Sequence, residues 1–249
     1  MSLSADLTRT LTRAAATSRL LVASDFDGTL APIVNNPGDA RPLRAAADAV
    51  IGLSGLADTA AALISGRALT VLRELSGMPD TVHLVGSHGA EFDSGFAHRI
   101  DDALLHTIGT ELTTIAADRP GVTIERKPAS VALHVRNASA ADAEAALAQA
   151  RAASATWNAQ LTEGKAVLEF AVITTDKGEA IDILRERHQA SVVVYFGDDV
   201  TDEKAFRRLH DGDVGVKVGS GVTLAGHRVD EPEDVATALN HLLRARQGR

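Results

Sequence analysis

Short apolar runs that stop abruptly at a small polar residue or a glycine recur along the chain. Four such runs, each followed at once by Ser or Gly, lie at residues 20–23, 59–64, 82–85 and 192–196. Short continuous apolar runs are typical of parallel strands that are buried on both faces. Helical patterns separate them, at residues 43–54, 68–76, 179–188 and 203–209. Strands that alternate with helices predict βαβ units and a doubly wound α/β sheet.

The middle of the chain has a different pattern. A helical stripe of Leu and Ile covers residues 104–115, and a second helix follows a Ser139 cap and runs through Arg151. Each helix precedes two expected strands, which lie at residues 122–127, 130–136, near 156–161 and 165–171. The order αββαββ predicts a small α+β domain at residues 102–175, inserted into a larger domain of residues 1–101 and 176–249.

Composition narrows the class of protein. The chain has 249 residues, of which 45% are hydrophobic and 23% are charged, as in ordinary globular proteins. There is no cysteine, which excludes disulfides, thiolate zinc sites and cysteine nucleophiles. The net charge of −8 argues against a nucleic-acid partner. No apolar run suits a membrane span or a signal peptide, so we expect a soluble cytoplasmic protein.

The polar residues that follow the apolar runs carry the candidate chemistry. They include Asp25 and Asp27, Ser65, His88, and an acidic segment from Asp198 to Glu203. Ligands of open α/β sheets bind outside the carboxyl ends of the strands. If the first and last of these strands are neighbours, Asp25, Asp27, Asp198 and Asp202 come close together. Crowded carboxylates repel one another unless a cation intervenes, and all-oxygen ligation suits Mg²⁺.

A plainer interpretation stays open for each acidic segment. Thr201 could cap a helix whose positive end favours Asp202 and Glu203. Asp176 could likewise cap a helix with Glu179 as its capping-box partner. That cap places Lys177 in the first turn, where it can hold an anion, although such lysines are commonly just solvated. The Ser65 hydroxyl suits a phosphate oxygen, but Ser-Gly turns are equally common without a function.

Strand parity gives a hint about the inserted domain. Residues two or four apart share a face of a strand, which pairs Glu125 with Lys127, His134 with Arg136, and Lys165 with Glu169. The opposite parity is apolar in the second and fourth expected strands. We therefore expect one face packed on helices and one charged face. The charged face is either solvated or able to hydrogen-bond a hydroxyl-rich ligand.

Four motifs in order give the chain a specific resemblance. The segment Asp25–Leu30, then Ser65, then Lys177, then Gly197–Asp199 resembles the motifs of the haloacid dehalogenase superfamily. Within it, residues 64–67, 86–91, 127–128, 134–136, 164–169, 176–178 and 197–203 resemble the trehalose-6-phosphate phosphatase family. The resemblance covers about residues 20 to 240. It implies a Rossmann-like parallel sheet as catalytic core, with the αββαββ insert as a mobile cap that closes over the carboxyl ends of the strands.

The resemblance also implies an activity and a set of residue roles. We expect a Mg²⁺-dependent phosphatase that converts trehalose 6-phosphate to trehalose and phosphate. Asp25 would attack phosphorus, and Asp27 would act as general acid and base. The metal would be held by Asp25, the Asp27 carbonyl and Asp198, with Ser65 and Lys177 on the phosphoryl group. Asp202 and Asp199 would lie behind the metal ligands, Asp202 orienting metal-bound waters.

Substrate contacts follow from the same resemblance. The expected residues on the sugar phosphate are Arg67, His88, Glu125, Lys127, His134, Arg136, Lys165 and Glu169. Phe26 and Val135 depart from a Tyr that is common in relatives. The alternatives are a phosphatase for sucrose phosphate, mannosyl-phosphoglycerate or a hexose phosphate, and a catalytically silent module that binds a trehalose-synthase partner. A trehalose-6-phosphate synthase of the same pathway is a further expected partner.

Overall fold

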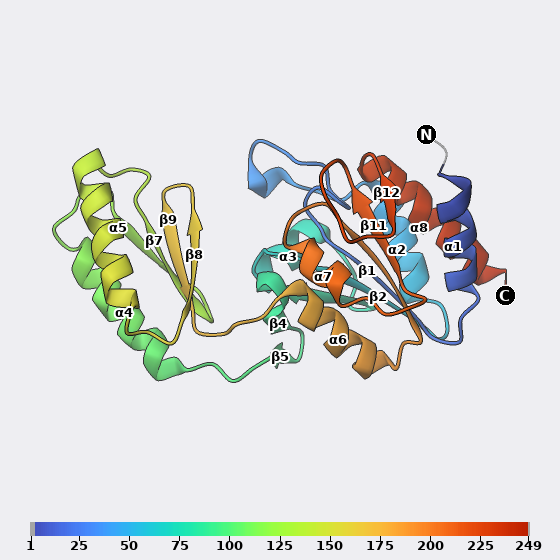
Figure 1. Cartoon of the computed structure of the whole chain (residues 1–249), viewed down its shortest axis with the longest axis horizontal. Coiled ribbons are helices and arrows are strands. Elements are labelled where there is room, and N and C mark those ends of the chain that lie inside the picture. Colours follow the sequence, from blue (N-terminus) through green and yellow to red (C-terminus); the bar gives the residue numbers. More distant parts are fainter. Residues whose placement is uncertain (1–2, 249) are drawn as a thin grey trace. The chain divides into compact units, whose positions relative to one another are not determined.

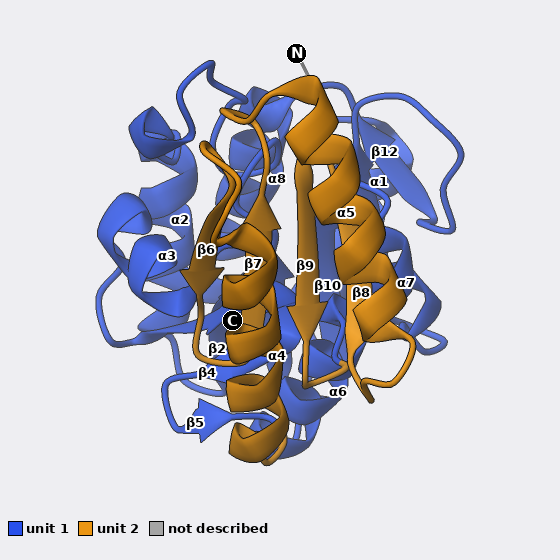
Figure 2. Cartoon of the chain, turned by 90° about the vertical axis from the view of Figure 1, so that its left-hand side faces the viewer, with its two compact units in different colours: residues 1–97, 175–249 blue, residues 98–174 orange. Residues whose placement is uncertain are grey.

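The computed structural model describes residues 3–248 and divides the chain into two compact units. Unit 1 joins the residues up to Ala97 with those from Thr175 onward, and unit 2 is His98–Thr174 (Figures 1 and 2). The two crossings between the units lie within four residues of the domain limits expected from the sequence.

Unit 1 is built on one mixed sheet of eight strands. Its order is β12-β11-β10-β1-β2-β3-β4-β5, and the pairs from β12 to β3 are all parallel. Two short strands, β4 and β5, extend this sheet antiparallel at one edge. The strands are β1 (Leu20–Ser24), β2 (Thr59–Ile64), β3 (Val82–Gly86), β4 (Glu91–Phe92), β5 (Gly95–Phe96), β10 (Val192–Gly197), β11 (Val214–Val218) and β12 (His227–Val229).

Helices cover both faces of this sheet, as a doubly wound fold requires. One face packs on α1 (Ala5–Ala15), α2 (Arg44–Ser54), α3 (Leu69–Ser76) and α8 (Pro232–Gln247). The other face packs on α6 (Lys177–His188) and α7 (Asp202–Arg207). Successive β1 residues alternate between the two cores, Leu20 and Val22 in one and Leu21 and Ala23 in the other. Two short 3₁₀ helices, η1 (Pro37–Asp39) and η2 (Ser87–Gly89), lie in loops.

The four apolar runs are confirmed as strands β1, β2, β3 and β10, and the predicted α/β class is confirmed with them. The predicted Asp176 cap also forms, because its Oδ1 accepts a hydrogen bond from the Glu179 amide at 3.0 Å. The α6 helix therefore begins at Lys177. Strands β11 and β12 and the β4–β5 hairpin are additions that the apolar runs do not predict.

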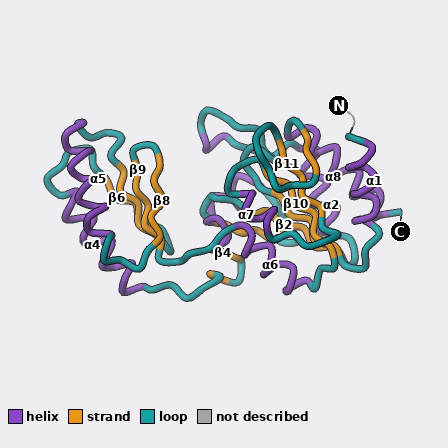
Figure 3. Tube along the Cα trace, viewed as in Figure 1, coloured by secondary structure: helices purple, strands orange, loops and turns teal. Residues whose placement is uncertain are grey.

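Unit 2 follows the order α4 (Asp102–Ala116), β6 (Thr123–Arg126), β7 (Ser130–His134), α5 (Ala140–Ser154), β8 (Gln160–Gly164) and β9 (Val167–Ala171). This is the expected αββαββ order, which the colours of Figure 1 follow along the chain, and Figure 3 separates its helices from its strands. Its antiparallel sheet runs β6-β7-β9-β8, and α4 and α5 lie over one face of it (Figure 2). That face is apolar, with Val131, Leu133, Leu168 and Phe170 buried against the two helices. The predicted split into an apolar and a polar face is therefore present within unit 2.

Several strand ends differ from expectation. Strand β8 begins at Gln160, four residues later than the pattern indicates. Lys127 and Arg136 lie just beyond the ends of β6 and β7, and Lys165 lies in the turn between β8 and β9. One member of each expected pair therefore lies outside the strand. Lys127 still reaches the face of Glu125, because its Nζ contacts Glu169 and both acids align with Ala132.

Among residues 3–248, no helix combines the length and the apolar stretch that crossing a bilayer requires.

Candidate active site

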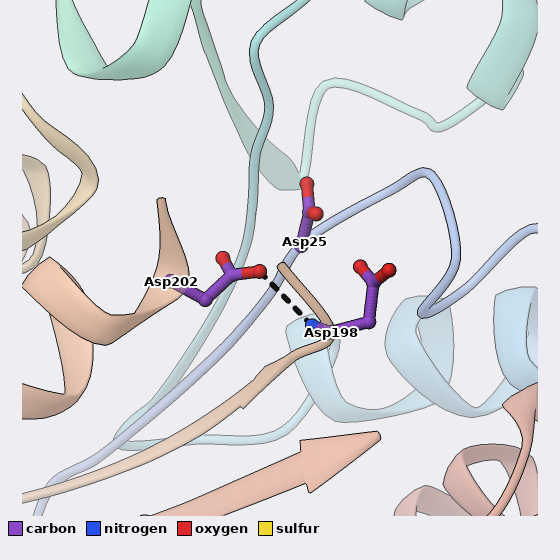
Figure 4. Close-up of side chains that lie close together, drawn as sticks. All are labelled: Asp25, Asp198 and Asp202. Atoms are coloured by element: carbon purple, nitrogen blue, oxygen red, sulfur yellow. Dashed lines mark hydrogen bonds between the residues drawn. The ribbon is translucent and has the colours of Figure 1, made fainter. Parts of the chain in front are cut away.

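Two neighbouring parallel strands bring the acidic segments together. Strands β1 and β10 pair in register from Leu20 with Val192 to Ser24 with Phe196, so both end at the same edge of the sheet. Asp25 follows β1 and Asp198 follows β10, while Asp202 begins α7. Carboxylate oxygens of Asp25, Asp198 and Asp202 lie within 4.8 Å of one another (Figure 4). The predicted convergence of the first and last strands is thus observed.

Crowding and burial perturb the protonation of these acids. Burial raises the pKa of Asp25 to about 8, and Asp202 adds to the rise while Lys177 opposes it. Burial also raises the pKa of Asp198, again with a contribution from Asp202. The site therefore holds more negative charge than its own cations offset.

Lys177 is the principal counter-charge. It is 2% exposed, and its Nζ lies 3.0 Å from Asp25 Oδ2 and 2.8 Å from Asp202 Oδ1. Burial alone would lower the pKa of this ammonium, but the two carboxylates outweigh it and raise the pKa. The first turn of α6 thus delivers a charged lysine to the carboxyl edge of β1, where Asp25 stands.

The Asp202 carboxylate accepts hydrogen bonds from four groups of the site. Its Oδ1 accepts hydrogen bonds from the Tyr195 hydroxyl at 2.6 Å and from Lys177, and its Oδ2 accepts from the amides of Asp198 and Asp199 at 2.9 Å each. Gly197 leaves room for it, because a Cβ there would lie 2.3 Å from the Asp202 Cγ. Four donors saturate the carboxylate. Asp202 therefore orients Asp198 and Lys177, and its expected role of orienting metal-bound waters stays a prediction.

The position of Asp198 depends on its neighbours in the β1 loop. Its Oδ1 accepts a hydrogen bond from the Thr29 hydroxyl at 3.1 Å. Gly28 has a φ of +77°, and a Cβ at that position would lie 2.2 Å from Asp198 Oδ2. Lys217 donates to the Asp198 backbone carbonyl from strand β11. The absence of a side chain at Gly28 is what allows the Asp198 carboxylate to approach Asp25.

Asp27 is held by Arg67 rather than standing free. The Arg67 Nε and a terminal nitrogen each donate to one Asp27 oxygen at 2.6 Å, which is a bidentate ion pair. The Ser65 hydroxyl oxygen accepts from the Arg67 amide at 3.2 Å, and its residue is buried at the end of β2. His88 is exposed, with its ring against Gly66. Arg67, expected on the substrate, is here a partner of the expected acid–base residue.

The two residues whose roles the sequence leaves open make local contacts. Asp199 is exposed, and its Oδ1 accepts from the Val200 amide at 2.6 Å. Glu203 Oε2 accepts from the Leu224 amide at 2.8 Å. Asp199 therefore stabilises the loop before α7, and Glu203 the loop between β11 and β12.

The donor set fits a hard divalent cation. Asp25, Asp198 and Asp202 offer carboxylate oxygens, and no nitrogen or sulfur ligand among the described residues belongs to the cluster. Mg²⁺ prefers such oxygen ligands and retains several waters. Their oxygens lie within 4.8 Å of one another, which suits an ion held between β1 and β10.

The polar residues expected on the sugar lie on one sheet of unit 2 and at its strand ends. Glu169 Oε2 accepts from Lys127 Nζ at 2.9 Å, and its Oε1 accepts from the Ser130 hydroxyl at 2.6 Å. His134 Nε2 lies 2.8 Å from Glu125 Oε2. Pairing aligns both Glu125 and Glu169 with Ala132 of β7, so the two acids share the face opposite the helices.

Arg136 and Lys165 stand apart from these pairs. Both are exposed, and they border a hollow of about 650 Å³ with Val135, Leu147 and Ala166. The expected set on unit 2 therefore divides into a hydrogen-bonded network centred on Glu169, a Glu125–His134 pair, and two exposed cations.

A family model described as trehalose-phosphatase matches residues 23–232. The chain belongs to the trehalose-phosphatase family. The match spans both units, from the last residues of β1 to the first residue of α8.

Members of the family resemble this chain to different degrees. The trehalose-6-phosphate phosphatase of Escherichia coli strain K12 is 34% identical over 231 residues, covering 90% of this chain and 86% of that protein. The trehalose-phosphate phosphatase of Mycobacterium avium is 34% identical over 228 residues, but this chain spans only 56% of its length. The solved structure of Aspergillus fumigatus trehalose-6-phosphate phosphatase aligns with a TM-score of 0.72 at 25% identity, covering 96% and 97% of the two chains.

Proposed function

We propose that this protein hydrolyses trehalose 6-phosphate to trehalose and inorganic phosphate. Membership of the trehalose-phosphatase family supports the reaction and the substrate. The observation that carries the proposal is the site itself: a buried carboxylate, Asp25, paired with Lys177 and within 4.8 Å of a second acid from the neighbouring strand. Phosphoryl transfer needs this alignment of a nucleophile with compensating charge.

In the proposed reaction, an Asp25 oxygen bonds to phosphorus as the bond from phosphorus to the sugar oxygen breaks. Asp27 gives its proton to the departing oxygen. Asp27 then takes a proton from the water that attacks phosphorus, and the bond between phosphorus and Asp25 breaks to release phosphate. Lys177 and the Ser65 hydroxyl hold the transferring group. Both Asp27 oxygens accept from Arg67 in the structure, so Asp27 must leave this pair to carry the proton.

Magnesium is the proposed cofactor. Asp25, Asp198 and the Asp27 carbonyl would hold it, and it would neutralise charge on the phosphoryl oxygens. Saturated Asp202 would keep Asp198 in place for that task.

The sugar is proposed to bind the open polar face of unit 2. That face carries Glu125, His134 and Glu169, with Lys127 beside them. Carboxylates and an ammonium that already hydrogen-bond one another can exchange those bonds for sugar hydroxyls. The exposed Arg136 and Lys165, together with His88, are further candidate contacts. Unit 1 would then perform the chemistry, as the catalytic core, while unit 2, as the cap, selects the disaccharide.

The test is a phosphate-release assay with trehalose 6-phosphate, sucrose 6-phosphate, mannosyl-phosphoglycerate and glucose 6-phosphate, each with MgCl₂ and with EDTA. We expect fastest release from trehalose 6-phosphate, abolished by EDTA. Asp25→Asn should abolish turnover, whereas Asp48→Asn, a matched change on the exposed face of α2, should not. Equal rates on glucose 6-phosphate would remove the disaccharide assignment.

A second experiment addresses the sugar face. Glu169→Ala should lower turnover of trehalose 6-phosphate far more than turnover of p-nitrophenyl phosphate, which lacks a sugar. Glu163→Ala is the matched control, because Glu163 lies on the opposite parity of β8 and pairs with Arg151. Equal losses on both substrates would move Glu169 out of the sugar site.

The proposed partner and location follow from the substrate. A synthase that makes trehalose 6-phosphate supplies it, and association with that enzyme in the cytoplasm would shorten its path. Co-elution of the two proteins in size-exclusion chromatography tests the association. A catalytically silent module is the alternative, and phosphate release from any sugar phosphate would exclude it.

A further inference from the structure

Lys217 is a buried lysine in an otherwise apolar strand. It is 5% exposed, and Val214, Val216 and Val218 of the same strand pack into the core on the side of α1, α2 and α8. Lys217 alternates with these valines, so its side chain leaves the other face of β11. A buried ammonium costs a large free energy unless it finds hydrogen-bond acceptors. The free-energy cost of burying Lys217 therefore depends on the acceptor that its ammonium contacts.

That acceptor is part of the candidate metal site. Lys217 Nζ donates to the backbone carbonyl of Asp198. Strand pairing sets Lys217 directly beside Gly197, one residue before Asp198. The lysine thus reaches the first peptide of the loop that connects β10 to α7.

The same peptide is held from its other end. Its carbonyl belongs to Asp198 and its N–H to Asp199, and that N–H donates to Asp202 Oδ2 at 2.9 Å. Lys217 on the carbonyl and Asp202 on the N–H therefore fix the plane of one peptide group. Fixing this plane restricts rotation about the bond between the Asp198 Cα and carbonyl carbon. The direction of the Asp198 carboxylate is restricted with it.

Lys217 has a second, opposite influence on a cation at this site. Its positive charge lies near Asp198 and repels a divalent ion held there. Removing the charge alone would therefore tighten cation binding, whereas removing the hydrogen bond would loosen Asp198 and weaken it. The two effects differ in sign, so a binding measurement separates them.

We propose that Lys217 is a positioning residue that clamps the Asp198–Asp199 peptide and thereby strengthens divalent-cation binding at the acidic cluster. The inference rests on the metal site of the proposed function. Partners that orient metal ligands typically contribute 10- to 100-fold to metal affinity. The clamp acts through Asp198 and does not contact the substrate.

The test is titration of the purified protein with MnCl₂, a paramagnetic substitute for Mg²⁺, followed by electron paramagnetic resonance. Lys217→Met keeps the length of the side chain and removes the ammonium, and we expect Mn²⁺ affinity to fall about tenfold. Lys204→Met is the matched control, because Lys204 is exposed on α7 and has the same charge. Unchanged or tighter binding in Lys217→Met would overturn the clamp.

Turnover gives a second readout. Saturating MgCl₂ should restore most of the turnover of Lys217→Met, because the variant loses only affinity for the cation. A general loosening of the core would not be rescued in this way. Turnover that stays low at saturating MgCl₂ overturns the assignment. If this variant does not fold, Lys217→Gln replaces it with the same expected loss. A wild-type protein that binds no Mn²⁺ would overturn the metal site itself, and with it the proposed function. Normal wild-type binding with an unaffected variant would overturn only the role of Lys217.

Discussion

Replacing Gly28 by alanine puts a methyl group where the carboxylate of Asp198 lies. The φ of Gly28 is +77°, and the added Cβ would be 2.2 Å from Asp198 Oδ2 and 2.5 Å from its Cγ. The substitution therefore has two separable effects. It strains the backbone at residue 28, and it displaces a carboxylate that the proposed metal site requires.

The structure sets the size of each effect. An L-residue in the left-handed region costs about 1–2 kcal/mol of stability. Nonbonded atoms separate to about 3.5 Å, so the Asp198 carboxylate must retreat by about 1 Å. Misplacement of a reacting group by 1 Å costs on the order of 10²-fold in rate. Gly28→Ala should thus lose about 100-fold in turnover but only about 1–2 kcal/mol in stability.

Gly77→Ala is the matched control. Gly77 has a φ of +60° at the end of α3, and a Cβ there would meet nothing within 4 Å. It should share the loss of stability in urea denaturation and keep wild-type phosphate release. If Gly28→Ala turns over within twofold of Gly77→Ala, the close approach of Gly28 to Asp198 has no functional role and the reasoning fails.

Three further perturbations test packing in unit 1, one at the site and two away from it. Tyr195→Phe removes a buried donor to the Asp202 carboxylate and should cost about 1.5–3 kcal/mol in urea denaturation, with a change below about 0.5 contradicting the bond. Burial lowers the pKa of both His83 and His188 below 6.5, so the unfolded chain binds more protons than the folded one and stability falls as the pH drops through 6.5. His188→Gln should flatten that fall in stability between pH 7.5 and 5.5, and an unchanged slope would refute the reasoning. Arg246→Met strips donors from four backbone carbonyls and one threonine hydroxyl and should cost about 3–5 kcal/mol in the same assay, where a loss under about 1 would count against it.

The sheet of unit 1 is readable from the sequence because its strands are buried on both faces. Continuous apolar runs mark β1, β2, β3 and β10, and the cap at Asp176 marks the start of α6. The adjacency of β1 and β10 is different, because paired residues such as Leu20 and Val192 lie 172 positions apart and no local pattern specifies their pairing. Acidic segments after both strands made the adjacency plausible, and the family motifs made it specific.

Strand ends in unit 2 were harder to predict, for a local reason. The pairing of Gly164 with Val167 leaves Lys165 and Ala166 as a two-residue loop. Such loops favour Gly or Asn, which tolerate positive φ. Here Ala166 adopts a φ of +64°, so the usual turn signal is absent and alternation continues through the loop.

Tyr195 and Lys217 were missed because each lies inside an apolar run. A polar atom within a buried strand must find a partner, which is a usable signal for both residues. The signal does not name the partner, however. Asp202 is seven residues from Tyr195, and the Asp198 carbonyl is 19 residues from Lys217. Only the folded loop between β10 and α7 joins them.

The charges gathered at this edge explain why two lysines accompany the acids. Asp25, Asp198 and Asp202 carry three negative charges when ionised, and Lys177 and Lys217 carry two positive ones, which leaves one negative charge in excess (3 − 2 = 1). Burial makes that excess costly, as the raised pKa of Asp25 shows. A divalent cation would reverse the local sign to one positive charge. A phosphate dianion would then meet an attractive site on a protein whose net charge of −8 otherwise repels it.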